Sequence, residues 1–207
     1  MTDTWILKAG MRLYPGAVWK LNTARKEIAL TFDDGPEPEI TPKVLAILAQ
    51  YARQATFFCV GNKAVKYPSL VQQIREQGHA VGNHSYSHCN GFFTSPKTYV
   101  EDVEKAQVIL QSSLFRPPYG RITPSQYKIL SKIYRIVFWN VMSYDFHPRF
   151  TAEKCLKHCL QNLQNGAVFV FHDTRMASRN LLTFLPEFLD TITSMGFDTV
   201  TLTNPVK

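Results

Sequence analysis

The 207-residue sequence predicts an α/β protein with a barrel of parallel strands, and three observations lead to this fold class. From residue 28 onward, short apolar segments rich in β-branched and aromatic residues alternate with segments of helical periodicity. The strand segments are apolar nearly throughout, which is typical of parallel strands covered on both faces. Polar residues gather directly after these segments, where a parallel α/β fold places its functional site.

About seven strands and six helices are expected in alternation. The first helix opens with Thr41-Pro42, a favourable pair at a helix N-terminus, while Gly78 and Gly196 end the second and last helices. We expect strands at residues 28–32, 55–60, 79–82, 113–116, 135–141, 167–171 and 197–202. We expect helices at residues 41–51, 69–77, 96–111, 124–133, 151–163 and 179–195.

These elements fit one domain better than two. A (β/α) barrel is the leading architecture, although roughly 200 residues is short for that fold. An open doubly wound sheet is the alternative, and it is disfavoured because no strand is followed by Gly-x-Gly-x-x-Gly. No linker or shift in composition divides the chain. We therefore expect a catalytic domain over residues 28–207 and an N-terminal extension, residues 1–27, that packs on the barrel.

Composition and charge exclude several classes of protein. The chain is 45% hydrophobic and 19% charged, which excludes intrinsic disorder, and no segment is apolar enough for a membrane span. The net charge of +7 is spread along the chain without a basic run, so no nucleic-acid partner is expected. The N-terminus lacks the pattern of a secretory leader, and a cytoplasmic protein is expected unless the sequence is a fragment.

Ionisable side chains follow most of the predicted strands. Alone, each has a structural explanation: Asp-Asp-Gly-Pro forms a turn, and two histidines four residues apart occur by chance on surfaces. Their combination at successive strand ends indicates an active site, because these ends converge at one rim of a barrel. The residues at the rim are Asp33, Asp34, His84, His88, Arg116, Tyr144, Asp145, His172 and Asp173.

The residue types at this rim suit metal-assisted hydrolysis of an amide or ester. One carboxylate and two neutral imidazoles make a three-ligand site that leaves positions open for water and substrate. Two adjacent aspartates on an extended segment point to opposite sides, so that one can bind metal while the other takes a proton from the activated water. A separate histidine, kept protonated by an aspartate, would serve as general acid.

Five segments resemble the motifs of the polysaccharide deacetylase family, the NodB-homology or carbohydrate esterase family 4 domain. Residues 31–36 (Thr-Phe-Asp-Asp-Gly-Pro) and 84–88 (His-Ser-Tyr-Ser-His) match the first and second motifs. Residues 116–119 (Arg-Pro-Pro-Tyr) match the third, and residues 168–172 (Val-Phe-Val-Phe-His) fit the fifth with valine for leucine. The resemblance implies a distorted (β/α) barrel and metal-dependent removal of N- or O-acetyl groups from glycans.

The resemblance also implies roles for the first two motifs. Asp33 resembles the catalytic base, and Asp34, His84 and His88 resemble the metal ligands. Zinc is the expected ion, because imidazole and carboxylate suit it, with cobalt or another divalent ion as the alternative.

The remaining motifs supply the implied supporting groups. Arg116 resembles the residue that orients the base by a charge-assisted hydrogen bond. The backbone N–H of Tyr119 resembles an oxyanion donor. His172 resembles the catalytic acid, and Asp145 resembles its charge partner.

The fourth motif departs from the family pattern Asp-x-x-Asp-Trp. Residues 142–146 read Met-Ser-Tyr-Asp-Phe, so Asp145 is retained while Met142 and Phe146 replace the first aspartate and the tryptophan. The substrate-binding wall therefore differs from that of the family, so the resemblance does not predict which sugar this protein binds. The residues expected to bind substrate are Pro118, Tyr119, Phe146 and His147.

Other candidate ligands have simpler interpretations. Cys155, His158 and Cys159 share one face of a predicted helix but lack a fourth ligand nearby, so they are expected to be packing residues. Cys89 follows His88 but is expected to be a bystander, because the three-ligand set is already complete. Asp173 either orients His172 or begins a turn.

Three functions are consistent with these residues and motifs. The leading one is a metal-dependent hydrolase that removes N-acetyl or O-acetyl groups from an amino-sugar-containing glycan. The second is a hydrolase of a small or cyclic amide on the same fold. The third is a non-catalytic glycan-binding module, which retention of the complete Asp and His set argues against.

Overall fold

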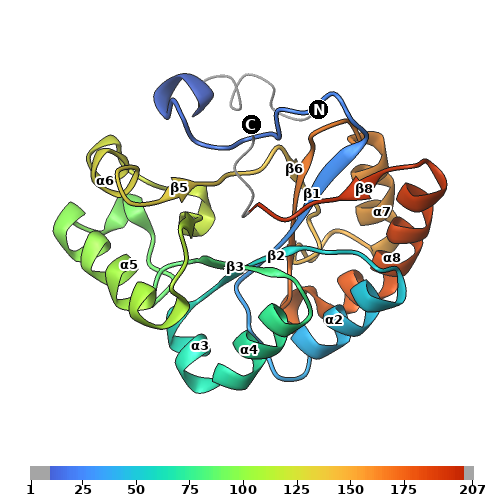
Figure 1. Cartoon of the computed structure of the whole chain (residues 1–207), viewed down its shortest axis with the longest axis horizontal. Coiled ribbons are helices and arrows are strands. Elements are labelled where there is room, and N and C mark those ends of the chain that lie inside the picture. Colours follow the sequence, from blue (N-terminus) through green and yellow to red (C-terminus); the bar gives the residue numbers. More distant parts are fainter. Residues whose placement is uncertain (1–9, 203–207) are drawn as a thin grey trace.

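The structure is a computed structural model of the chain, and it describes residues 10–202. One parallel sheet lies at the centre, and helices surround it (Figure 1). The strands are β1 (Glu27–Asp33), β2 (Thr56–Cys59), β3 (Ala80–Asn83), β4 (Leu114–Phe115), β5 (Arg135–Ile136), β6 (Val141–Met142), β7 (Val168–His172) and β8 (Asp198–Thr199). The helices are α2 (Thr41–Gln50), α3 (Gly61–Lys66), α4 (Pro68–Glu76), α5 (Pro96–Leu110), α6 (Pro124–Leu130), α7 (Ala152–Gln161) and α8 (Arg175–Ser194), with 3₁₀ turns η1 (Gly91–Phe93) and η2 (Pro118–Gly120).

The sheet is a curled half-barrel. Its strand order is β5-β4-β3-β2-β1-β7-β6, and β8 pairs with β1 beside this path. Within residues 10–202 the end strands β5 and β6 do not pair with each other, so the barrel stays open between them. The predicted distorted barrel of parallel strands is confirmed.

The core of the half-barrel is aromatic. Phe32 of β1, Phe57 of β2 and Phe171 of β7 are buried, and the rings of Phe32 and Phe57 stack with centroids 4.9 Å apart. Helix α8 covers this region with Phe184 and Phe188, which contact the Phe171 ring. Phe58, next to Phe57 in β2, is fully buried in the cluster on the opposite face, which explains why the strands are apolar without alternation.

The register of the sheet brings the functional strand ends together. The Cα of Asp33 in β1 pairs with that of His172 in β7. On the other side, Asn83 at the end of β3 pairs with Phe115 at the end of β4. The residues that follow, His84 and Arg116, therefore emerge side by side at the same rim.

The predicted strand 135–141 is wrong as a single element, because it divides into β5 and β6. Between them, the N–H of Phe138 donates to the carbonyl of Val18 (2.7 Å), and Val18 donates to Ile136 (2.8 Å). The Trp19 ring stacks on Phe138 with centroids 4.0 Å apart. The segment preceding β1 thus takes the hydrogen bonds that a continuous strand would have given to its neighbour.

Other differences concern element lengths. The predicted last strand shrinks to Asp198–Thr199, and α3 is an additional helix. Helix α8 begins at Arg175, four residues earlier than predicted, because the Thr174 hydroxyl accepts the Ala177 N–H and caps it. None of the helices in the described part of the chain combines the length and apolarity needed to cross a bilayer.

The N-terminal segment from residue 10 lies along the open side of the half-barrel. The N–H of Leu21 donates to the Gly166 carbonyl just before β7 (2.8 Å), and Val18 bridges to Val137 after β5. This segment therefore links the two sides that β5 and β6 leave unpaired. The domain boundary at residue 28 stays a prediction, and residues 1–9 lie outside the described part.

Candidate active site

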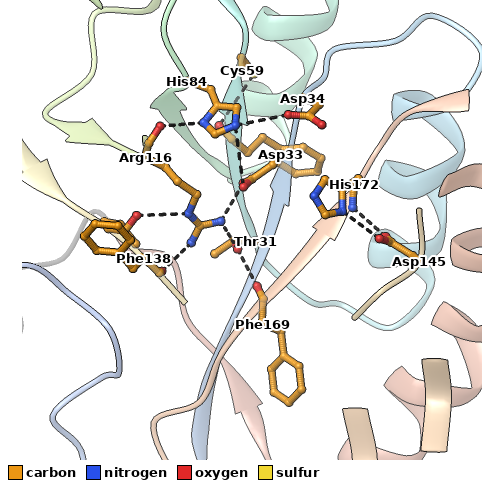
Figure 2. Close-up of polar contacts among 12 residues, drawn as sticks. Thr31, Asp33, Asp34, Cys59, His84, Arg116, Phe138, Asp145, Phe169 and His172 are labelled. Carbon is orange, nitrogen blue, oxygen red and sulfur yellow. Dashed lines mark hydrogen bonds and ion pairs between the residues drawn. The ribbon is translucent and has the colours of Figure 1, made fainter. Parts of the chain in front are cut away.

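Asp33 and Arg116 form a buried ion pair at the centre of the rim. Arg116 Nη1 lies 2.7 Å from Asp33 Oδ1, and both side chains are almost completely buried. Arg116 also donates to the Thr31 hydroxyl (2.6 Å) and to the Phe138 carbonyl (3.0 Å), as Figure 2 shows, and to the Val137 carbonyl (3.3 Å). These partners fix the guanidinium, which in turn fixes one oxygen of the Asp33 carboxylate.

Asp34 leaves the strand in a left-handed conformation. Its φ is 73°, so the expectation that both aspartates lie on one extended segment is wrong. Their side chains nevertheless point to different partners. The left-handed turn, rather than the strand pleat, sends the Asp34 side chain to the histidines while Asp33 faces Arg116. Gly35 follows because a Cβ atom there would collide with the Asp173 carboxylate.

Asp34, His84 and His88 form a group that could hold a metal ion. Their ligand atoms all lie within 4.8 Å of one another. Asp34 Oδ1 is 3.3 Å from His84 Nε2 and 2.9 Å from His88 Nε2. Burial raises the pKa of Asp34, but hydrogen bonds with His84 and His88 outweigh it and hold the pKa well below its ordinary value.

The hydrogen-bond partner of His84 also fits a metal site. His84 Nδ1 lies 2.7 Å from the Arg116 backbone carbonyl, which can only accept a hydrogen bond (Figure 2). In a neutral His84 the proton therefore sits on Nδ1, which leaves the Nε2 lone pair available to a metal ion shared with Asp34. Metal-bound histidines commonly have this arrangement. The donor set of two imidazoles and one carboxylate suits zinc and similar divalent ions.

Buried Asp145 pairs with partly buried His172, which lies beside Asp33 where β7 pairs with β1. His172 Nδ1 lies 2.8 Å from Asp145 Oδ1. Burial lowers the pKa of His172, but the charge and hydrogen bond of Asp145 outweigh it, with smaller contributions from Asp34 and Asp33, and raise the pKa to about 9. The imidazole is therefore cationic at neutral pH and can donate a proton.

Asp173 does not orient His172 through a side-chain contact. Its Oδ2 accepts the Thr41 hydroxyl (2.5 Å), and the same hydroxyl accepts the Glu37 N–H (2.8 Å). Its Oδ1 is buried without a partner among the described residues. Burial raises the pKa of Asp173 to about 7. Asp173 thus joins the end of β7 to Thr41 at the start of α2.

A cavity of about 610 Å³ opens above these groups. Arg116 and Asp145 lie behind it as buried partners of Asp33 and His172. Pro118 and His147 are not among the described residues that line it: Pro118 is buried, and the His147 ring packs edge-on against Phe150. The predicted site residues that do line it are Asp33, Asp34, His84, His88, Tyr119, Phe146 and His172.

The cavity wall also contains residues that sequence reasoning missed. Trp139, Asn62, Lys63 and Met176 line it, and they come from segments without a motif. Met142, which replaces the usual fourth-motif aspartate, lines it as well. This part of the wall is therefore apolar where the family pattern has a carboxylate.

The fold and the site together define a hydrolase of the parallel α/β barrel class. The chain belongs to the polysaccharide deacetylase family, whose model matches residues 20–134. The predictions of family, fold and enzyme class are thereby confirmed.

Two curated relatives and one crystal structure support this membership. The chain is 31% identical over 199 residues to a peptidoglycan-N-acetylglucosamine deacetylase of Bacillus cereus, covering 91% of this chain and 92% of that protein. It is 33% identical over 167 residues to a chitooligosaccharide deacetylase of Azorhizobium caulinodans, covering 76% and 79%. A crystal structure of a peptidoglycan N-acetylglucosamine deacetylase in complex with 4-naphthalen-1-yl-N-oxidanyl-benzamide superposes with a TM-score of 0.87 and 31% identity, covering 98% of this chain and 95% of that one.

Proposed function

We propose that this protein removes N-acetyl groups from a glycan that contains N-acetylglucosamine, with a divalent metal ion as cofactor. The observation that carries the proposal is the convergence of Asp34, His84 and His88 beside the buried Asp33–Arg116 pair. The substrates named for the relatives, peptidoglycan N-acetylglucosamine and chitooligosaccharide, supply the substrate class.

Asp34, His84 and His88 would hold the metal ion, and zinc suits their donor atoms. When bound, such an ion lowers the pKa of water and polarises the carbonyl of the scissile amide. The chain's own residues then account for the proton transfers.

Asp33 is assigned as the general base. Its Oδ1 is held by Arg116 Nη1, and its Oδ2 lies 4.0 Å from His84 Nε2, on the side of the ligand group. We assign this oxygen to take the proton of the attacking water as the new C–O bond forms. The bond from Arg116 holds Oδ1 in place, so that Oδ2 stays on the side of the ligand group.

His172 is assigned as the general acid. It lines the cavity and is cationic at neutral pH because Asp145 pairs with it. When the C–N bond breaks, His172 donates its proton to the departing amine nitrogen, and acetate and the free amino sugar are the products. The backbone N–H of Tyr119 is assigned to the developing oxyanion; Tyr119 has a left-handed φ of 60° and lines the cavity.

An acetate-release screen tests this proposal. The substrates are N-acetylglucosamine oligomers, peptidoglycan fragments, an O-acetylated xylan and a small cyclic amide, each with and without a chelator. We expect chelator-sensitive acetate release from the N-acetylated glycans. Release only from the O-acetylated glycan, hydrolysis only of the cyclic amide, or no hydrolysis by metal-loaded protein would each overturn it.

A further inference from the structure

The loop between β3 and η1 carries two of the three proposed ligands in an unusual backbone conformation. Ser85 and His88 both have positive φ values, 61° and 59°, although neither is glycine. Such conformations are uncommon for residues other than glycine and persist only where surrounding contacts impose them. The contacts that impose them here must act on the residues between His84 and His88.

Asp102 makes those contacts from helix α5. One oxygen, Oδ2, accepts the backbone N–H groups of Tyr86 (2.9 Å) and Ser87 (3.1 Å), and it accepts the Cys89 thiol (3.4 Å). Hydrogen bonds to a carboxylate are stronger than those between neutral groups. A single carboxylate therefore holds three of the four residues that follow Ser85.

Helix α5 is a rigid support for this carboxylate. Tyr99, Val103 and Ala106 are fully buried on the same helix. The Asn83 side chain, at the end of β3, donates to the Val103 carbonyl (3.0 Å) and so ties the start of the loop to the helix. Lys105 adds a cation–π contact, with its Nζ 3.7 Å from the Tyr86 ring.

We infer that Asp102 is a positioning residue that holds the loop 84–89 in the conformation in which His84 and His88 converge on Asp34. It acts through Tyr86, Ser87 and Cys89 and is not one of the residues that line the cavity. The inference rests on the metal site of the proposed function. Cys89 was expected to be a bystander, but its thiol donates to Asp102 and so helps to hold the loop.

Three variants separate this role from a general effect on folding. Asp102→Ala removes the acceptor, whereas Asp102→Asn keeps a neutral oxygen acceptor at nearly the same place. Glu101→Gln makes the same carboxylate-to-amide change one residue earlier, where Glu101 is exposed and pairs with exposed Lys97 at 3.9 Å. Partners outside the ligand set commonly affect metal affinity by about 10–100-fold when they are removed.

The experiment titrates metal-free protein with Zn²⁺ against a chromophoric chelator and records the visible spectrum of the Co²⁺ form. We expect Zn²⁺ affinity to fall about 10–100-fold in Asp102→Ala, with an altered Co²⁺ spectrum. The loss in Asp102→Asn should be smaller but measurable, and Glu101→Gln should match the wild type. Hydrogen exchange of the Tyr86 and Ser87 amides should accelerate in Asp102→Ala.

The outcomes distinguish this inference from the proposed function. Wild-type Zn²⁺ affinity and an unchanged Co²⁺ spectrum in Asp102→Ala would overturn the inference alone. If Asp102→Ala does not fold, Asp102→Asn decides, and wild-type affinity in that variant overturns the inference. A wild-type protein that binds neither ion would overturn the proposed metal site, and the inference with it.

Discussion

Asp145 holds His172 at two points. Its Oδ1 pairs with the imidazole Nδ1 of His172 at 2.8 Å, and its Oδ2 accepts the backbone N–H of the same residue at 2.8 Å. The Phe146 N–H also donates to Oδ1 (3.0 Å), and Asp145 is fully buried. The carboxylate thus fixes both the charge and the orientation of the imidazole, and leaves Nε2 for the substrate side.

The first prediction concerns the pH dependence of turnover. For the wild type, kcat/KM should fall on the alkaline side near pH 9, where His172 loses its proton. In Asp145→Asn the charge that raises the pKa of His172 is gone, so this limb should move to lower pH. The measurement is kcat/KM against pH for both proteins, and an unmoved limb would contradict the pairing.

A second prediction concerns the leaving group. An amine leaves only when protonated, whereas the leaving group of an activated ester needs no proton. His172→Ala should therefore keep its metal and lose about 10²–10⁴-fold in kcat on an N-acetylglucosamine oligomer, but far less on an activated acetyl ester. Equal losses on the two substrates would show that His172 is only part of the cavity wall.

A third prediction separates the adjacent aspartates. Asp33→Asn removes a base and no ligand, so the variant should keep one metal ion per chain and lose about 10²–10⁴-fold in kcat. Asp34→Asn should instead weaken metal binding. Metal content and acetate release are measured on the same preparations, and loss of metal in Asp33→Asn would reverse the two assignments.

A fourth prediction concerns stability and the buried carboxyl group of Asp173. Its pKa is about 7 in the folded protein and near the ordinary 3.8 when unfolded. A folded pKa raised in this way means that its stabilising contribution is complete below pH 3.8 and is lost as pH rises to about 7.

Asp173→Asn cannot ionise, so the free energy of unfolding of this variant, minus that of the wild type, should rise between pH 4 and pH 7 and then level off. Chemical denaturation at several pH values gives this difference, in which the titration of other groups largely cancels. A difference that does not change with pH would show that Asp173 is ionised at neutral pH in the folded protein, contrary to the prediction.

The sequence predicts the sheet and its rim well because the information is local. Each apolar run is short, and each motif directly follows one, so strand parallelism alone brings Asp33, His84, Arg116 and His172 to one rim. The pairing of His172 with Asp145 was predictable for the same reason, since His172 ends β7 and Asp145 follows the neighbouring strand β6.

The remaining features depend on contacts between distant segments. The division into β5 and β6 follows from pairing with Val18, more than a hundred residues earlier, which no local pattern reveals. Asp102 and the Thr41–Asp173 pair are ordinary polar residues whose partners appear only after folding. The left-handed φ of Asp34 could not be predicted from the sequence, because an aspartate at the end of a strand can either continue it or begin a turn.

The most direct test of the central claim measures metal content and acetate release together. Wild-type protein and His88→Ala are treated with a chelator, dialysed, and assayed on an N-acetylglucosamine oligomer before and after one equivalent of Zn²⁺ is added. We predict that wild-type protein loses its activity with its metal, regains both at a ratio of one ion per chain, and that His88→Ala regains neither. Wild-type acetate release that persists in metal-free protein, or full recovery by His88→Ala, would contradict the account.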